Sequence, residues 1–487
     1  MKLKGLACVV VLLGSAWAQV ASSVPRPVDS TQLMAWLAGG VSTARLSQLL
    51  QQRGIAFTPG EDYLQSVRSA GAGDALIEAL RSARVEDSTT GPASFLPDLA
   101  AAARLTWEKQ YQMAEETLRR ILKEDPGNAA LHFALGTVLR RQEDWEAAFD
   151  EFTESARLMP GLPETHSRLA YLFCRTDDGD NAIAEARTAL SLDPGNAEAY
   201  RMLGLGFAAN GKHNAALHAY EESLLRQPEN ADVYYDMGIT LRESGDLHRA
   251  AAAYRKAIQL DPSFWEAHGN LGIVLQHLKR TDEAIAEYRE AKRLAPEEAS
   301  VRHNLGSAFC DQGDFDAAIA ELQDLYRMAP DWQQGHSCMA KALMAKRDYP
   351  AAIAQLRQAI RHNPTGAAEH RVLGQALLLV GKHSEAEAEL RLALAFSPGS
   401  ALAHHYLATA LLNQQEFDEA AAEFRETLRL EPTAANHYYL AACLMSMARY
   451  PEALKELETA ARLAPEEELY RVRKQELVRL MRATASR

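Results

Sequence analysis

The chain has 487 residues and a formal net charge of −13 at pH 7, with 47% hydrophobic and 24% charged residues. This length accommodates several domains or one long repeat array. The acidic balance argues against broad nucleic-acid binding, which needs basic surface to displace counterions, although it does not exclude a local basic patch.

The first 18 residues have the features of a secretory signal peptide. Two lysines precede the short apolar stretch 5–13, and the sequence AWA at 16–18 matches the small-x-small pattern before a cleavage site. The apolar stretch is too short to span a membrane, and no other stretch approaches that length. We therefore expect cleavage near Ala18 and export, periplasmic or secreted, with no integral membrane span.

Residues 29–84 are expected to form a small all-helical module. Apolar stripes separated by glycine and proline predict helices at about 30–38, 43–53, 61–70 and 73–84. The sequence VEDSTTGPAS at 85–94 has the composition of a linker. Two arrangements are compatible with this pattern, a module on a flexible linker and a cap packed on the repeat that follows.

From residue 126 onward, prolines recur at a fixed interval. They fall every 34 residues from Pro126 to Pro432, and Pro465 follows after 33 residues. A period this regular requires tandem repetition of a unit of about 34 residues.

Each repeat is expected to form two helices joined by a turn. With the proline at position 32, position 20 is alanine in all ten repeats and position 8 is glycine or alanine, so the helices can approach closely there. Large apolar residues at positions 7, 11 and 24 fill the surrounding space, and the proline ends the second helix. The expected division is a degenerate first repeat at 95–128, ten repeats at 129–467 and a C-terminal capping helix at 468–487.

These residues resemble the tetratricopeptide repeat family. The segments YRMLGLGFAANGKHNAALHAYEESLLRQP (200–228) and HGNLGIVLQHLKRTDEAIAEYREAKRLAP (268–296) are close to its pattern. The resemblance implies an all-α fold, a right-handed α-solenoid of stacked helix–turn–helix repeats with a small N-terminal helical module and a C-terminal capping helix. With the signal-like N-terminus, it indicates an exported bacterial member.

The resemblance also implies where a ligand would bind. In this family the first helices of the repeats line a concave groove, which positions 2, 5, 9 and 12 generally face. In this chain those positions carry aromatic, arginine and hydroxyl side chains suited to an extended peptide with some acidic groups. The candidate groove residues are Arg140, Tyr171, Arg201, Tyr235, Arg242, His303, Lys341, Arg371, His405 and Tyr438.

No sequence motif points to catalysis, a cofactor or a metal. Residues 206–213 (GFAANGKH) resemble a phosphate-binding loop but lack the serine or threonine that ligates magnesium, and no strand precedes them. The four cysteines of the mature chain form no C-x-x-C pair. We expect them to be buried small apolar side chains, although disulfides remain open: Cys174, Cys310, Cys338 and Cys443.

Seven of the 15 histidines occupy repeat position 4, among them His404 of the pair His404-His405. This position is usually a large aromatic residue in the related family, so we expect these histidines to be packing residues. Neighbouring copies lie roughly 10 Å apart, too far to share one metal ion. If burial lowers their pKa values, stability should be lost as the pH falls through about 6.5.

The sequence thus favours a non-enzymatic scaffold that binds a protein or peptide in its groove, without nucleic acid or cofactor. The alternative is an accessory or regulatory subunit of a cell-envelope enzyme or of a secretion or polymer-synthesis complex. In that case the partner would contact the convex face and the module at 29–84.

Overall fold

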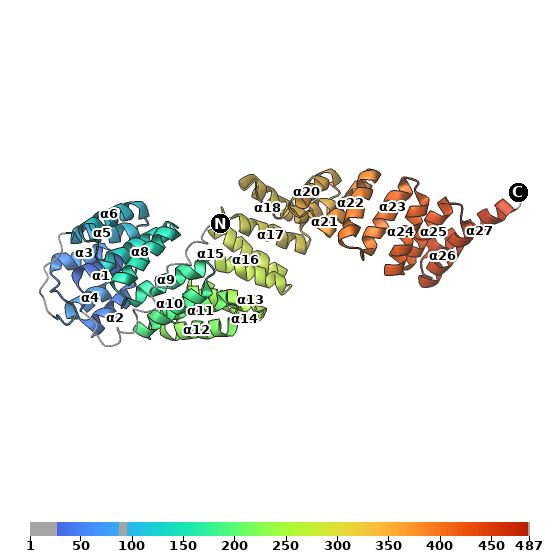
Figure 1. Cartoon of the computed structure of the whole chain (residues 1–487). Helices are drawn as coiled ribbons and strands as arrows, with labels where there is room; N and C mark the ends of the chain where they lie inside the picture. The colour runs from blue at the N-terminus through green and yellow to red at the C-terminus, as the bar shows by residue number, and fades with distance from the viewer. Residues whose placement is uncertain (1–26, 87–94, 486–487) are drawn as a thin grey trace. The chain divides into compact units, whose positions relative to one another are not determined.

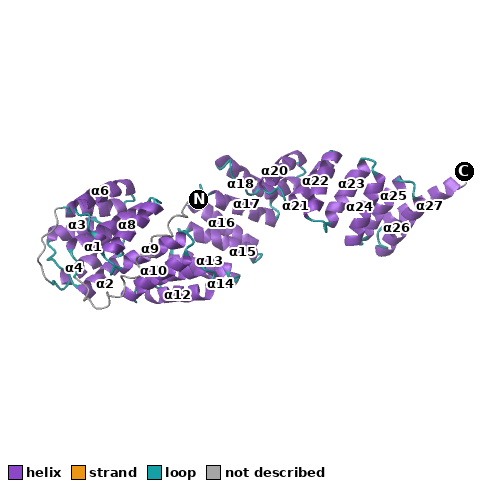
Figure 2. Ribbon diagram, viewed as in Figure 1, coloured by secondary structure: helices purple, strands orange, loops and turns teal. Residues whose placement is uncertain are grey.

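The computed structural model describes residues 27–86 and 95–485, and the chain divides into two compact units, Met1–Asp261 and Pro262–Arg487. Helices form the described part of both units, apart from isolated β-bridges that Ile55 makes with Val28 and Val85 (Figure 2). The expected signal peptide at 1–18 and most of the expected linker at 85–94 lie outside the described residues.

Four short helices open the first unit, close to the positions expected from the sequence. Their starts are set by polar or flexible residues: Asp29 and Gln32 form a capping box, and Ser42 accepts a hydrogen bond from the amide of Arg45. The helices are α1 (Ser30–Ala38), α2 (Thr43–Arg53), α3 (Glu61–Ser69) and α4 (Asp74–Ser82).

Five helical hairpins complete the first unit (Figure 1). The first helices of the hairpins are α5 (Leu96–Trp107), α7 (Ala129–Arg141), α9 (Pro163–Arg175), α11 (Ala197–Ala209) and α13 (Ala231–Glu243). The second helices are α6 (Tyr111–Glu124), α8 (Trp145–Leu158), α10 (Gly179–Leu192), α12 (His213–Arg226) and α14 (Leu247–Leu260).

The second unit contains six further hairpins and a final helix that packs on α26. The first helices are α15 (Trp265–His277), α17 (Ala299–Gln312), α19 (His336–Ala345), α21 (Ala367–Leu379), α23 (Ala401–Asn413) and α25 (Ala434–Ser446). The second helices are α16 (Thr281–Leu294), α18 (Phe315–Met328), α20 (Tyr349–His362), α22 (His383–Phe396), α24 (Phe417–Leu430) and α26 (Tyr450–Leu463). The final helix is α27 (Glu468–Ala485). The fold is therefore an all-α array of stacked helical repeats.

Prolines fix the ends of the second helices. Each of these helices in the 34-residue array ends two residues before a proline, as Glu124 does before Pro126. The intervening residue leaves the helical conformation, with φ −134° and ψ 71° at Asp125, because the ring of a following proline disfavours helical backbone. The prolines that revealed the period in the sequence thus also terminate the repeats in the structure.

Where position 8 is glycine, it lies directly against a large side chain at position 24 of the same repeat. A Cβ at Gly238 would lie 2.5 Å from Cε1 of Tyr254, and one at Gly272 would lie 2.5 Å from Cε1 of Tyr288. Real Cβ atoms do not approach this closely, so the aromatic ring needs glycine there. The alanines at position 20 are fully buried in all ten repeats, which confirms the expected close contact between the two helices.

The histidines at position 4 make paired hydrogen bonds that the sequence analysis missed. Nδ1 contacts a carboxylate 19 residues later, on the second helix, at 2.5 to 2.7 Å in six repeats. In four of these, Nε2 also lies 3.0 to 3.1 Å from the carbonyl oxygen of the proline that ends the preceding repeat. The six pairs are His132–Glu151, His166–Glu185, His268–Glu287, His370–Glu389, His404–Glu423 and His437–Glu456.

The other four repeats show that positions 4 and 23 vary together. Position 23 is alanine in the repeats of Tyr200 and Tyr234, and Arg302 forms an ion pair with Glu321 at 3.6 Å. The seventh histidine, His336, contacts the neutral Gln355 at 2.7 Å.

In two of the three repeats without a histidine at position 4, an arginine reaches the same carbonyl. Arg226 donates to Pro194 and Arg302 to Pro296, both at 3.2 Å. A donor from a basic or imidazole group therefore satisfies the carbonyl at the end of the preceding repeat in six places, where a positive charge also interacts favourably with a helix C-terminus.

The expectation that burial lowers the pKa of these histidines is wrong for His132. Burial acts to lower that pKa, but the hydrogen bonds to Glu151 and to the Pro126 carbonyl outweigh it, so the pKa is raised. Both partners accept hydrogen bonds, and only a doubly protonated ring donates to both. For His336 the expectation is confirmed: burial lowers the pKa, and the hydrogen bond to Gln355 does not compensate.

The cysteines divide into two kinds. Cys310 on α17 and Cys338 on α19 form a disulfide between two neighbouring first helices, so the expectation that all four are simply buried apolar side chains is wrong for this pair. Cys174 and Cys443 are free, and Cys443 is fully buried as expected.

We predict that Gly238→Ala destabilises the first unit by about 1–3 kcal/mol, because the new methyl group would overlap the buried ring of Tyr254. The midpoint of urea unfolding, followed by circular dichroism, measures the effect. The double variant Gly238→Ala/Tyr254→Phe should recover part of the loss, because alanine already lies at position 8 opposite Phe424 in another repeat. Gly269→Ala is the control, since a Cβ at that helical position has nothing within 4 Å. A similar loss in both single variants would contradict the account.

We also predict opposite effects from exchanging the histidine partners. Glu151→Gln should lower the pKa of His132, and Gln355→Glu should raise that of His336, because only a carboxylate stabilises the charged ring. NMR titration of the ¹³C-histidine-labelled chain measures both, with the exposed His218 as a control.

The sign of the accompanying stability change is fixed by the raised pKa of His132. A raised pKa in the folded state stabilises the fold below the unfolded pKa, and this stabilisation is lost as the pH rises through the folded pKa. Glu151→Gln should therefore cost more stability at about pH 5.5 than at about pH 8.5. A larger cost at the higher pH would refute the assignment of a charged ring.

Candidate binding pocket

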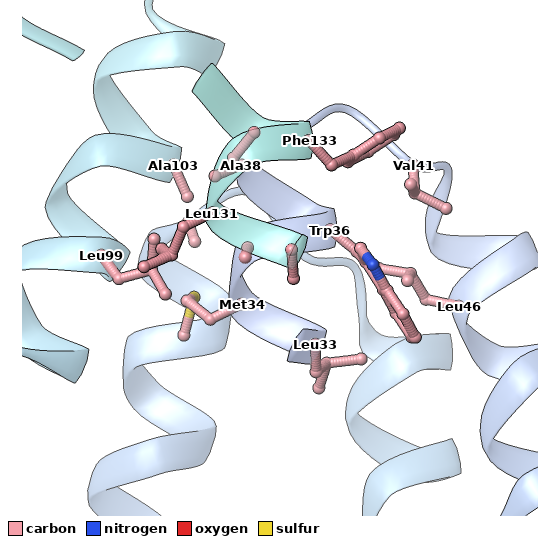
Figure 3. Packing of buried hydrophobic residues seen from close by; sticks show 14 of the residues in the cluster. Leu33, Met34, Trp36, Ala38, Val41, Leu46, Leu99, Ala103, Leu131 and Phe133 are labelled. Atoms are coloured by element: carbon pink, nitrogen blue, oxygen red, sulfur yellow. The ribbon is translucent and has the colours of Figure 1, made fainter. Parts of the chain in front are cut away.

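The N-terminal helices pack directly onto the first helices of the repeats. Trp36 on α1 lies in one buried cluster with Leu99 on α5 and Leu131 on α7 (Figure 3). The approach is so close that a Cβ at Gly39 would lie 2.5 Å from Cε1 of Phe133. The sequence was compatible with a module on a flexible linker and with a cap packed on the repeats. These contacts are those of a cap.

This cap covers part of the surface that the family resemblance assigned to the ligand groove. Phe133 occupies repeat position 5, which the family resemblance placed on an open groove, but its side chain is fully buried. Arg45 on α2 adds a polar tie, with its guanidinium 2.8 Å from Glu164 on α9 and 2.6 Å from Asp193. The groove implied for the first full repeat is therefore closed by α1 and α2.

A pocket of about 680 Å³ lies where α2 meets the repeats of the first unit. Its walls come from α2 and the loop before it, from the C-terminal end of α7, from α9, and from the N-terminal ends of α11 and α13. Arginines outnumber carboxylates in the lining. The arginines are Arg45, Arg140, Arg141, Arg168, Arg201 and Arg226, and the carboxylates are Glu164, Glu198 and Asp232.

Most of these arginines are already paired. Besides Arg45 with Glu164, Arg168 lies 3.4 Å from Glu198, and Arg201 lies 3.1 Å from Asp232. Arg201 also approaches the buried Asp236 to 2.6 Å. These pairs hold the walls of the pocket together and leave little free positive charge on their own arginines.

Arg140 is different, because no carboxylate in the described residues forms an ion pair with it. Its Cζ lies 5.2 Å from the centre of the Tyr171 ring, and its buried Nε has no hydrogen-bond partner within residues 27–86 and 95–485. Burial, followed by repulsion from Arg168 and Arg141, lowers the pKa of Arg140 to about 10. A cation desolvated next to other cations gains free energy when an anion supplies the missing charge.

The ten groove candidates lie in both units. In the first unit, Arg140, Tyr171 and Arg201 line the pocket together. Tyr235 packs its ring 5.8 Å from that of Tyr254, and Arg242 is half-buried on the same helix, α13; neither is among the pocket residues.

In the second unit, His405 and Tyr438 belong to an aromatic cluster built from α23, α25 and α27. The ring of His405 lies 4.6 Å from that of Tyr439, and Tyr438 packs 5.6 Å from Tyr470. Burial lowers the pKa of His405, which favours a neutral packing residue.

The three remaining candidates of the second unit lie on different helices. His303 on α17 lies beside Trp332, with 6.2 Å between the ring centres. Lys341 is exposed on α19, and Arg371 is half-buried on α21.

Sequence reasoning missed four arginines of the pocket, Arg45, Arg141, Arg168 and Arg226, the last of which lies at the end of a second helix, α12. Arg45 lies outside the repeats, so the repeat register carried no information on the face it would meet. Arg141 and Arg168 occupy positions 13 and 6, which were not among the expected groove positions.

Over residues 27–86 and 95–485, no group of three or more histidine, cysteine or acidic side chains is placed to hold a metal ion. Within the same ranges, no helix has both the length and the apolar character needed to cross a bilayer.

Three family models match this chain. The Cilia and flagella-associated protein 70 C-terminal domain matches residues 159–373, the Anaphase-promoting complex, cyclosome, subunit 3 matches 390–460, and the Tetratricopeptide repeat matches 109–163. A search of curated proteins gave no match.

Solved structures of helical-repeat proteins are similar over part or most of the chain. PilF of Pseudomonas aeruginosa is 20% identical over 42% of this chain and 94% of its own, with a TM-score of 0.39. YrrB, a tetratricopeptide repeat protein with an unusual peptide-binding site, is 23% identical over 40% of this chain and 97% of its own, with a TM-score of 0.32. A chain of the APC/C hetero-tetramer Cut9–Hcn1 is 14% identical over 80% of this chain and 91% of its own, with a TM-score of 0.38.

TM-scores this low carry no conclusion about function. The family matches agree with the 34-residue period and the helical hairpins. The helical array is therefore similar to the tetratricopeptide repeat family, whose model matches residues 109–163.

Proposed function

We propose that the chain is a non-enzymatic scaffold that holds a peptide segment of a partner protein in the pocket between α2 and the repeats. The observation that carries this proposal is Arg140, a cation that has no carboxylate partner among the described residues and lies over the Tyr171 ring in a pocket of about 680 Å³. Clefts with an aromatic surface and a few directed polar groups are typical ligand sites. Arginine and tyrosine are also the residue types that most often dominate binding energy at interfaces.

Export to the periplasm or the exterior is part of the proposal. The signal-like sequence at 1–18 supports it, and so does the disulfide between Cys310 and Cys338, because disulfides persist mainly in oxidising compartments.

A second candidate, an accessory subunit of a cell-envelope enzyme or of a secretion or polymer-synthesis complex, is favoured by Trp107. This side chain is 73% exposed at the end of α5, beside the turn at Gly71 of the N-terminal cap. An exposed tryptophan is a frequent anchor of protein interfaces. In this case the partner would bind the outside of the cap and not the pocket.

Deleting residues 29–84 does not separate the two candidates, because it would uncover Phe133 and the rest of the shared core. Point substitutions on the full chain avoid this problem. Peptides selected from a random display library against the immobilised chain are measured by titration calorimetry on the unaltered chain, on Tyr171→Ala and on Trp107→Ala.

We predict that Tyr171→Ala weakens binding of the selected peptides by at least about tenfold, whereas Trp107→Ala changes it little. The reverse pattern would favour the accessory-subunit candidate. Failure to select any peptide that binds in solution would contradict a peptide-binding scaffold.

A further inference from the structure

The distribution of charge in the pocket departs from that of the chain as a whole. The chain carries a net charge of −13, yet six arginines and three carboxylates line this one pocket. Each of the three carboxylates lies within 3.4 Å of an arginine of the lining. The excess positive charge therefore falls on arginines that these carboxylates do not neutralise.

Arg140 and Arg141 carry that excess. Neither forms an ion pair with a described residue. Arg226, another arginine of the lining, does not add to the excess, because it is paired at 2.7 Å with Glu222, which lies outside the pocket. Cζ of Arg140 lies 5.2 Å from the centre of the Tyr171 ring, and the charges of Arg168 and Arg141 repel its guanidinium. A guanidinium fixed in this way is preorganised to donate hydrogen bonds to an oxyanion.

We propose that the pocket binds a carboxylate group of an acidic peptide segment, with Arg140 as its main contact and α2 as one wall. This inference rests on the proposed peptide-binding function and specifies the chemistry of its ligand. A guanidinium binds a carboxylate through two parallel hydrogen bonds, which neutral groups cannot match.

The size and surroundings of the pocket favour a short acidic peptide over a nucleic acid. A pocket of about 680 Å³ admits a few side chains. A nucleic-acid strand needs an extended basic track, which a chain of this net charge does not favour.

The wall formed by α2 makes this site depend on the N-terminal cap as well as the repeats. Val41, Ala44 and Gln48 line the pocket from the cap. Ala44 is exposed on α2, so a larger side chain is accommodated there without disturbing the buried core. A carboxylate at this position would compete with the ligand while every arginine remains in place.

The test uses fluorescent octapeptides on the full chain, with fluorescence anisotropy as the readout. Three peptides differ only at four positions, which carry glutamate, glutamine or phosphoserine. The variants are Arg140→Gln, Ala44→Glu and the control Arg157→Gln, which removes the same charge from an exposed site on α8 in the same unit. Circular dichroism and thermal unfolding check that each variant is folded.

We expect the glutamate peptide to bind at least about tenfold more tightly than the glutamine peptide. Arg140→Gln and Ala44→Glu should each weaken its binding by at least about tenfold, and Arg157→Gln by less than about twofold. Equal losses in Arg140→Gln and Arg157→Gln would overturn the proposal, because binding would then follow overall charge. A phosphoserine peptide that binds about tenfold more tightly than the glutamate peptide would also overturn it, in favour of phosphate.

The failure of this inference is distinguishable from failure of the proposed function. If neutral or basic peptides from the random library bind and depend on Tyr171 while the glutamate peptide does not bind, the scaffold function stands and the acidic ligand is wrong. If no peptide of either kind binds, both are wrong.

Discussion

The contact between the two helices of each repeat is the constraint on which the rest of the structure depends. Alanine at position 20 is fully buried in all ten repeats, and in nine of them the small residue at position 8 is accompanied by a large side chain at position 24. At Gly238 the Tyr254 ring leaves no room for a Cβ. Since a single hairpin cannot bury both its faces, this contact produces units that must stack, and stacking places the first helices side by side. Four of the six arginines of the pocket lie on three of these first helices, α7, α9 and α11.

The N-terminal cap turns this regular surface into a specific pocket. The cap covers Phe133 and so removes from solvent part of the surface formed by the first helices. Helix α2 also supplies a wall of the pocket that no repeat provides. Arg45 joins that wall to α9 through Glu164. The carboxylates of the lining are used in holding these helices together, so Arg140 is left without one. The same packing that builds the site therefore leaves a buried cation in it without a counter-charge from the lining.

Much of the fold could be predicted from the sequence, and less of the site. Prolines and small residues at fixed spacing report backbone geometry directly, so the hairpins and their ends followed from them. The histidine–glutamate pairs could also have been predicted, because positions 4 and 23 change together, as at Tyr200 and Ala219. Considering each repeat position separately missed this correlation. The pocket was not predictable in this way, since Arg45 lies outside the repeat register and its partner Glu164 is 119 residues away.

Native-state hydrogen exchange tests most directly the central claim that the cap and the repeats form one packed structure. Amides of α1 and α7 should exchange slowly and to a similar extent in the full chain, because they share one buried cluster. Gly39→Val should speed exchange in both helices together, since the added side chain meets the Phe133 ring, and should leave α25 in the second unit unchanged. Exchange of α1 at the rate of an unfolded peptide while α7 stays protected would contradict the account.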